Sequence, residues 1–114
     1  MEVPEGLEIR ESPIHGLGVF ATKDFPVGYC FGEFIGEEMP WRDFTARYGK
    51  DFRYCYKMRR IHRVINAKEK RNWITFINEG KPNVILRKRF CFSLRPLKAG
   101  EELLLDYGYY PTHT

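Results

Sequence analysis

Glycine and proline interrupt this chain so often that no long regular element can form. The 114 residues include 10 glycines and 7 prolines. Proline fixes φ and removes an N–H donor, while glycine permits left-handed turns. The apolar runs left between them are short, and those that we expect to be strands are 8–12, 19–21, 29–35, 52–58, 63–65, 84–86, 90–94 and 102–107. Short strands separated by frequent turns predict a mainly β fold.

One segment has helical rather than strand periodicity. Trp41, Phe44 and Tyr48 fall on one stripe of a helix over 40–48, and Gly49 is placed to end it. Residues 71–77 fit either a strand or a helical turn. We therefore expect short helices in a mainly β domain, with a helical insert over about residues 38–52.

Length and cysteine usage bound the class of protein. A chain of 13.6 kDa corresponds to a single domain, 1–114, and is too short for a TIM barrel. It has no apolar run long enough to cross a membrane and no basic-then-apolar leader, so we expect an intracellular protein with no membrane partner. Cys30, Cys55 and Cys91 form no Cys-x-x-Cys pair. Reduced thiols and no metal site are therefore predicted.

Charge is unevenly distributed. Seven of the 19 lysines and arginines lie between Lys57 and Arg71, with one acid, Glu69, among them. An acidic stretch carries Glu33, Glu37 and Glu38. A basic run of this kind is typical of a surface that contacts nucleic acid, but exposed lysine and arginine also protect sheet edges. Both interpretations stay open at this point.

Common catalytic motifs are absent. Gly16-x-Gly18 lacks the third glycine of a dinucleotide-binding loop, because position 21 is alanine. There is no Walker loop, no Gly-x-Ser-x-Gly and no His-Glu-x-x-His. Nucleotide hydrolysis, serine hydrolase chemistry of the α/β type and zinc proteolysis are therefore disfavoured.

Four other segments stand in an unusual order and spacing. They are 12–21 (SPIHGLGVFA), 28–37 (GYCFGEFIGE), 72–83 (NWITFINEGKPN) and 100–108 (GEELLLDYG). Singly, each reads as a turn, a polar loop or a strand. Together they resemble the SET domain, the family of S-adenosylmethionine-dependent protein lysine methyltransferases.

The resemblance implies a cofactor site and a fold. Gly16, Leu17 and Gly18 would approach S-adenosylmethionine with their backbone, as residues without an obstructing Cβ can. Asn78, Glu79 and Tyr107 would contact it too, and Pro82-Asn83 also match the family's loop. The implied fold is the SET-domain (β-clip) fold of several small curled sheets. Its C-terminal pseudoknot would bring Asn78 and Tyr107 together.

The resemblance also implies catalytic residues. Tyr107 matches the family's catalytic tyrosine, and Tyr54 matches a second active-site tyrosine. With Tyr109 they would line a channel in which a lysine arrives neutral for in-line methyl transfer. Leu105 stands where the family places an aromatic residue that limits product methylation. Because leucine cannot hold a water, di- or trimethylation is expected.

The chain departs from the family pattern in three places. Glu79 replaces a histidine in a loop that is one residue shorter, and Thr75 replaces an arginine. Flanking cysteine-rich zinc modules are absent from this sequence. The Asn72-Trp73 pair is similar to that of PR-type SET domains.

Three hypotheses follow. The first is an active protein lysine methyltransferase acting on a histone tail, with a nuclear location and a weak contact between nucleosomal DNA and the run Lys57 to Arg71. The second is a catalytically inactive SET-like domain that binds protein or chromatin, which Glu79 favours. The third is an unrelated basic β module that binds nucleic acid. The oligomeric state is not indicated by the sequence.

Overall fold

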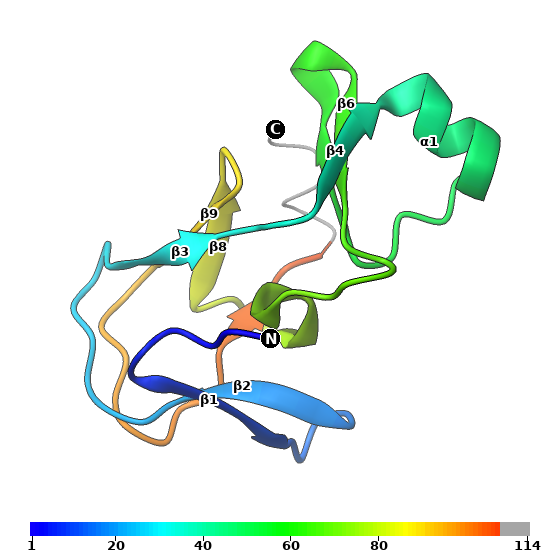
Figure 1. Cartoon of the computed structure of the whole chain (residues 1–114). Helices are drawn as coiled ribbons and strands as arrows, with labels where there is room; N and C mark the ends of the chain where they lie inside the picture. The colour runs from blue at the N-terminus through cyan, green and yellow to red at the C-terminus, as the bar shows by residue number, and fades with distance from the viewer. Residues whose placement is uncertain (108–114) are drawn as a thin grey trace.

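The computed structural model describes residues 1–107, which build four small sheets instead of one continuous sheet (Figure 1). The first is an antiparallel hairpin of β1 (Leu7–Glu11) and β2 (Leu17–Ala21). In its loop the Ser12 amide donates to the Gly16 carbonyl at 2.7 Å. Gly16 has a φ of +44°, a left-handed conformation that suits glycine. The hairpin loop is thus fixed at both ends.

The second sheet has the order β3-β9-β8 and is antiparallel throughout. Its strands are β3 (Cys30–Glu33), β8 (Val84–Arg87) and β9 (Phe90–Ser93). Lys88 and Arg89 join β8 to β9 with φ values of 50° and 70°. Two successive left-handed residues give the turn that matches strand twist in a tight hairpin. The basic run Arg87–Arg89 is therefore a hairpin turn.

The third sheet has the order β4-β6-β5 and carries the helix. Its strands are β4 (Glu37–Pro40), β5 (Cys55–Met58) and β6 (Arg63–Asn66), with the short 3₁₀ turn η1 (Arg59–Ile61) between the last two. The helix α1 (Trp41–Tyr48) buries Phe44 and ends at Gly49, whose φ is 63°. The predicted helix over 40–48 is therefore present.

The strand predicted over 52–58 is shorter in the structure. It begins only at Cys55, because Tyr54 has a φ of 63° and lies in a turn. A left-handed residue cannot continue the extended backbone of a strand. The ambiguous segment 71–77 contains the 3₁₀ turn η2 (Trp73–Phe76), which the Asn72 side chain caps by accepting from the Ile74 and Thr75 amides.

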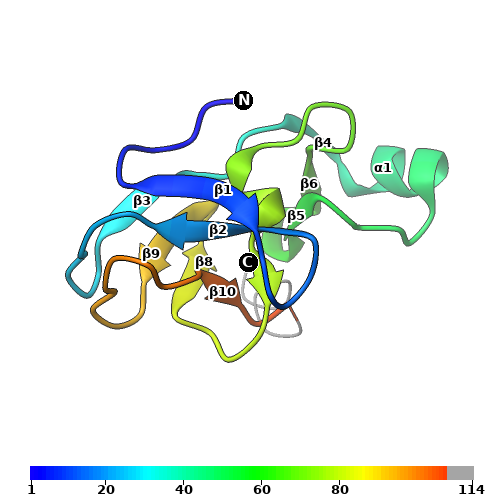
Figure 2. The same ribbon diagram turned by 90° about the horizontal axis from the view of Figure 1, so that it is seen from below.

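The C-terminal segment crosses between parts of the chain that are far apart in sequence. β10 (Leu104–Leu105) pairs in parallel with β7 (Asn78–Glu79), while on its other side Leu103 and Glu101 bond the backbone of β2 (Figure 2). The loop after β7 closes over it, since the Gly80 and Asn83 amides donate to the carbonyls of β10. This enclosed crossing is the pseudoknot that the resemblance implies.

Two turn segments that each contain a lysine, a proline and a glycine, 23–28 and 95–100, pair with each other. Phe25, in the turn before β3, and Leu97, in the turn after β9, exchange both backbone hydrogen bonds at 2.9 Å. Both side chains are buried. They join the main core, which draws on all four sheets and includes Val19, Phe31, Phe34, Tyr56, Ile65, Trp73, Ile77, Leu86, Cys91, Leu103 and Leu105. A smaller core of Met39, Phe44, Cys55 and Val64 lies under α1.

Candidate functional site

The loop before β2 and the start of β7 are joined by one amide group. Nδ2 of Asn78 lies 3.0 Å from the His15 carbonyl, 3.1 Å from the Leu17 carbonyl and 2.9 Å from Oε2 of Glu102. The structure therefore brings the predicted cofactor residues Gly16, Leu17 and Gly18 against Asn78. The amide nitrogen is used inside the protein, so the Oδ1 oxygen is what Asn78 can offer a ligand.

Glu102 is a residue of this site that sequence reasoning missed. Its carboxylate oxygens lie 2.8 and 2.9 Å from the Ser12 hydroxyl, and Oε2 also accepts from Asn78. A bridge between Phe20 and Glu102 fixes its backbone. The carboxylate thus ties the loop, β7 and the C-terminal segment together. The only sequence signal was its place in the Gly-Glu-Glu motif at 100–102.

The two glycines of the loop serve different purposes. A Cβ on Gly18 would stand 2.3 Å from Oε2 of Glu102 and 3.1 Å from Nδ2 of Asn78, so a side chain there has no room. A Cβ on Gly16 would meet nothing within 4 Å, but its φ is left-handed. Glycine is therefore needed at position 18 because the Glu102 carboxylate occupies the space of a side chain. At position 16 the space beside the backbone is open.

Asn83 stabilises the fold and does not face the open space beside Gly16. Its side chain is buried, donates to the Glu102 carbonyl at 2.8 Å and accepts from the Leu104 amide at 2.8 Å. Both ends of the amide are therefore occupied by the C-terminal segment. Asn83, matched by sequence to a cofactor loop, clamps the crossing in place.

Tyr107 lies at the end of this crossing. Its hydroxyl donates to the Ile77 carbonyl, one residue before Asn78. Burial raises the pKa of Tyr107 to about 12, the nearby Glu79 and Tyr54 also raise it, and Arg71 lowers it. A phenol with so high a pKa keeps its proton at neutral pH, so Tyr107 acts as a hydrogen-bonding group and not as a base.

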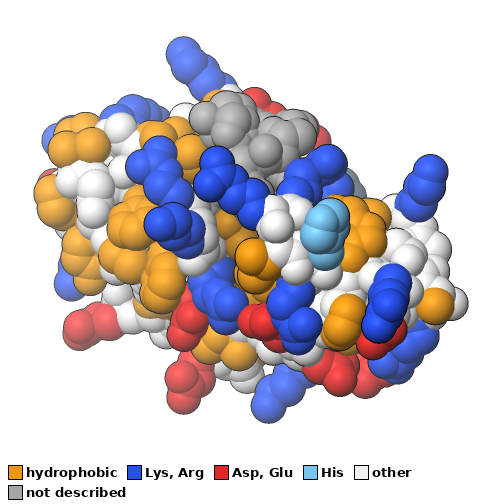
Figure 3. Space-filling model, turned by 90° about the horizontal axis from the view of Figure 1, so that it is seen from above, with side chains coloured by type: hydrophobic (Ala, Val, Ile, Leu, Met, Phe, Trp, Pro, Cys, Tyr) orange, Lys and Arg blue, Asp and Glu red, His pale blue; other side chains and the backbone are white. Residues whose placement is uncertain are grey.

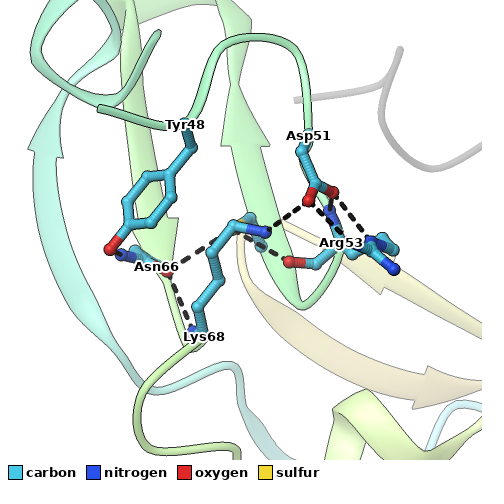
Figure 4. A network of polar contacts seen from close by, with 6 residues as sticks. Tyr48, Asp51, Arg53, Asn66 and Lys68 are labelled. Atoms are coloured by element: carbon cyan, nitrogen blue, oxygen red, sulfur yellow. Dashed lines mark hydrogen bonds and ion pairs between the residues drawn. The ribbon is translucent and has the colours of Figure 1, made fainter. Parts of the chain in front are cut away.

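Tyr54 is held beside Tyr107 by the turn before β5. Its carbonyl accepts from the Ala67 amide at 3.0 Å, and the turn is fixed by a polar network (Figure 4). In that network the Asp51 carboxylate binds the Arg53 guanidinium at 2.8 and 2.9 Å and Lys68 Nζ at 3.4 Å. The predicted pair of tyrosines thus comes from the middle and from the C-terminal part of the chain.

The two predicted channel residues have different outcomes. Leu105 is buried in the core and lines a cavity of about 270 Å³, whose other lining residues are Pro82, Val84, Ile85, Arg87, Leu94 and Asp106. Its predicted role in the channel stays a prediction. Tyr109 lies outside the described residues. Glu79 is exposed on β7, opposite Leu105 in the register.

An acidic groove of about 580 Å³ lies beside the segment that contains Arg71. Its lining residues are Met1, Glu2, Glu33, Ile35, Gly36, Glu37, Asn66, Glu69, Lys70, Arg71, Asn72 and Trp73. Of the acidic stretch noted in the sequence, Glu33 and Glu37 face this groove. Glu38 instead binds Arg63 at 2.6 Å and Arg89 at 2.9 Å, and these two arginines hold its pKa below the ordinary value.

Part of the basic run makes contacts within the protein. Arg63 binds Glu38, Lys68 binds Asp51, and Lys57 lies 4.5 Å above the Phe52 ring. On the face shown in Figure 3, lysine and arginine side chains are interspersed with apolar and acidic ones and form no continuous basic surface. Contact with nucleosomal DNA through this run stays a prediction.

Some kinds of site are not found in residues 1–107. No group of three or more His, Cys, Asp or Glu side chains is arranged to hold a metal ion there. Cys55 and Cys91 are buried, Cys30 is exposed, and none of the three forms a disulfide. In the same part of the chain, every helix is too short or too polar to span a bilayer.

Comparison with known proteins identifies relatives along most of the chain. The family model of the SET domain matches residues 16–108. Histone-lysine N-methyltransferase Set2 of Drosophila melanogaster is 32% identical over 108 residues, covering 82% of this chain and 5% of the relative. N-lysine methyltransferase KMT5A-A of Danio rerio is 30% identical over 129 residues, covering 93% and 36%. This chain thus spans a small part of the curated relatives that it matches.

Solved structures agree with the fold. The methyltransferase domain of human PR domain-containing protein 2 is 27% identical, with a TM-score of 0.67 over 90% of this chain and 76% of that one. A polycomb complex (ctPRC2) in an autoinhibited conformation, bound to S-adenosylmethionine, has a TM-score of 0.77 at 20% identity, covering 94% of this chain and 16% of that one.

Proposed function

The chain belongs to the SET-domain family, and from that membership we propose that it transfers a methyl group from S-adenosylmethionine to a lysine side chain of a protein. One observation carries the proposal. The loop 15–18, Asn78 and the Tyr107 hydroxyl meet at a single backbone crossing, although they are up to 92 residues apart in sequence (107 − 15). Named lysine methyltransferases among the relatives support it.

The residues at the crossing fit the proposed cofactor. Gly16 leaves open space where a side chain would stand, and Asn78 has an amide oxygen that can accept from an ammonium group. Gly16, Leu17, Gly18, Asn78 and Glu79 would hold the ligand, with Tyr107 at its reactive end. S-adenosylmethionine, when bound, supplies an electrophilic methyl group on a sulfonium. For Glu79 the proposed contact is made by its main chain, which pairs with β10 in β7.

The chemistry asked of the protein is alignment and desolvation. A lysine amine attacks only when neutral, and a half-buried aromatic pocket favours the neutral amine over the ammonium. We assign Tyr54, Tyr107 and, beyond the described residues, Tyr109 to that pocket. The Tyr107 hydroxyl keeps its own proton, so it orients the amine and does not remove a proton from it.

The proposed substrate is a basic protein tail, with a histone tail as the leading case. Glu33 and Glu37 give the groove beside Arg71 an acidic wall that attracts lysine and arginine side chains. An extended peptide that adds alongside a strand would suit it. Relatives named as histone-lysine methyltransferases support the histone, and with it a nuclear location. Leu105 offers no hydrogen bond to a water, so di- or trimethylation is proposed.

A second candidate function is an inactive SET-like module that binds protein or chromatin. The observation that favours it is Glu79, an exposed carboxylate on β7 where the family pattern has a histidine. It predicts binding of a histone tail without methyl transfer.

Mass spectrometry of histone-tail peptides after incubation with S-adenosylmethionine tests the choice. The enzyme should raise the mass of a lysine in steps of about 14 daltons, one step for each methyl group. Tyr107→Phe should slow transfer by about 100-fold or more, because the oriented hydroxyl is lost at the reacting centre. Tyr29→Phe, which removes a hydroxyl from an exposed tyrosine elsewhere, should match the wild type. Peptide binding without any product would select the inactive module.

A further inference from the structure

Arg71 lies between two aromatic rings at the edge of the proposed lysine pocket. Its guanidinium carbon is 3.9 Å from the centroid of the Tyr54 ring and 3.9 Å from the centroid of the Phe76 ring. A planar, weakly hydrated guanidinium stacks on aromatic faces in a way that a lysine ammonium does not. One side chain thus connects the turn before β5 to η2.

The guanidinium is fixed by hydrogen bonds as well as by stacking. Nε donates to Oγ1 of Thr75 and a terminal nitrogen donates to the Thr75 carbonyl, each at 3.0 Å. Thr75 in turn donates to the Asn72 carbonyl at 2.7 Å. Asn72 caps η2 and donates to the Ile35 carbonyl at 2.7 Å. Arg71 is therefore bound to η2, and η2 is in turn held by the hydrogen bonds of Asn72.

Tyr54 needs such support. It is 41% exposed and has a left-handed φ, so its backbone is fixed by the turn but its ring is not enclosed by a core. A ring that samples several rotamers would orient a substrate poorly, and small displacements of an active-site group are costly for catalysis. The stacked guanidinium covers one face of the ring, while the residue as a whole stays exposed enough for a substrate to reach it.

We propose that Arg71 is a positioning residue of the active site, which holds the Tyr54 ring in place for lysine binding and methyl transfer. The inference rests on the proposed function, because Tyr54 has this role only in a lysine methyltransferase. It also gives Thr75 a purpose. Thr75 stands where the family pattern has an arginine, and here it accepts a guanidinium that arrives from four residues earlier.

Arg71 also reaches other parts of the proposed site. Arg71 acts on Tyr107 as well, whose pKa it lowers against the opposing effects of burial, Glu79 and Tyr54. The same side chain lines the acidic groove. Arg71 therefore touches the groove, Tyr54 and η2 at once, whereas Arg60, in the same basic run, is exposed on η1.

A double-mutant cycle with methyl transfer as the readout tests the proposal. Arg71→Met keeps a flexible, unbranched apolar side chain but removes the guanidinium, and should lower kcat by about tenfold, as expected for loss of two stacked contacts. In a Tyr54→Ala background the same change should cost less than about twofold, because the ring that Arg71 positions is gone. Arg60→Met should behave as wild type. Affinity for S-adenosylmethionine should be unchanged in all variants.

Two results would overturn the proposal. One is an Arg71→Met variant with full activity, and the other is an equal loss of kcat with and without the Tyr54 ring. If the wild type transfers no methyl group to any peptide, the proposed function fails, and the positioning contact is judged by NMR. Tyr54 ring signals that move in Arg71→Met but not in Arg60→Met would support it, and unmoved signals would refute it.

Discussion

At the scale of single residues, the site depends on a carboxylate behind a glycine. Glu102 occupies the space that any side chain at position 18 would need, and it binds Ser12 and Asn78 from there. The two glycines of the Gly-x-Gly motif are therefore needed for different reasons. Gly18 allows the loop to close on Glu102, and Gly16 allows a left-handed turn with an open side.

This difference predicts unequal costs for two alanine substitutions. Gly18→Ala should lower the free energy of unfolding by about 2 to 3 kcal/mol, since Glu102 must move and lose hydrogen bonds in a part-buried site. Gly16→Ala should cost about 1 kcal/mol, the strain of a left-handed alanine. Urea unfolding of both variants measures the difference. Equal costs would contradict the role assigned to Glu102.

The pKa of Tyr107 gives a prediction about pH. Its value of about 12 in the folded protein lies above its ordinary value of 10.0. The stability that the neutral phenol contributes is thus fully present below pH 10 and lost as the pH rises through 12. The tyrosinate absorbance of wild type minus Tyr107→Phe should show the late titration. Glu79→Gln should bring it to lower pH, whereas Glu33→Gln should not. A midpoint near 10 would refute the burial of the hydroxyl.

At the scale of elements, the helix was easier to predict than the strands. The helix over 40–48 was predictable because its apolar stripe, and the glycine that ends it, are local signals. The strand over 52–58 was overpredicted because alternation of aromatic residues does not reveal a left-handed residue at Tyr54. The pairing of Phe25 with Leu97 depends on tertiary contacts that no local pattern encodes.

The site followed the same rule. Gly16, Asn78, Tyr54 and Tyr107 were predictable because the order and spacing of their motifs resemble those of the SET domain. In the structure Asn78 binds the loop that contains Gly16, and Tyr107 binds the residue before Asn78. The roles of Glu102 and Arg71 were not, because Glu102 depends on Ser12, 90 residues earlier, and Arg71 depends on the ring of Tyr54, which comes from another element. Asn83 was matched to the cofactor loop, but only its hydrogen bonds reveal that it clamps the crossing.

That clamp predicts a specific weakness in the fold. Asn83→Ala removes the side-chain amide and leaves the Glu102 carbonyl and the Leu104 amide without the hydrogen bonds that it makes to them. The free energy of unfolding should fall by about 2 to 4 kcal/mol, since buried polar groups would stay unsatisfied. Hydrogen exchange should show faster exchange at Leu104 and neighbouring amides. Unchanged exchange there would contradict the clamp.

At the scale of the whole molecule, some surface carboxylates form ion pairs within the protein and others line a groove. Glu38 is bound by two arginines, while Glu33 and Glu37 line the groove beside Arg71. Changing both Glu33 and Glu37 to glutamine should raise the KM for a basic histone peptide by about three- to tenfold at low salt, and by less at high salt. Glu38→Gln is the matched control and should leave KM unchanged. An unchanged KM in the double variant would place the peptide elsewhere.

Calorimetric titration of S-adenosylmethionine tests the central claim most directly, because it asks whether the crossing of loop 15–18, Asn78 and Tyr107 is a cofactor site. The wild type should bind saturably, and Asn78→Ala should lose binding because the amide that joins the loop to β7 is removed. Tyr54→Phe, altered on the lysine side of the site, should bind as the wild type does. Saturable binding that Asn78→Ala retains in full, or no binding by the wild type even with a histone peptide present, would contradict the account.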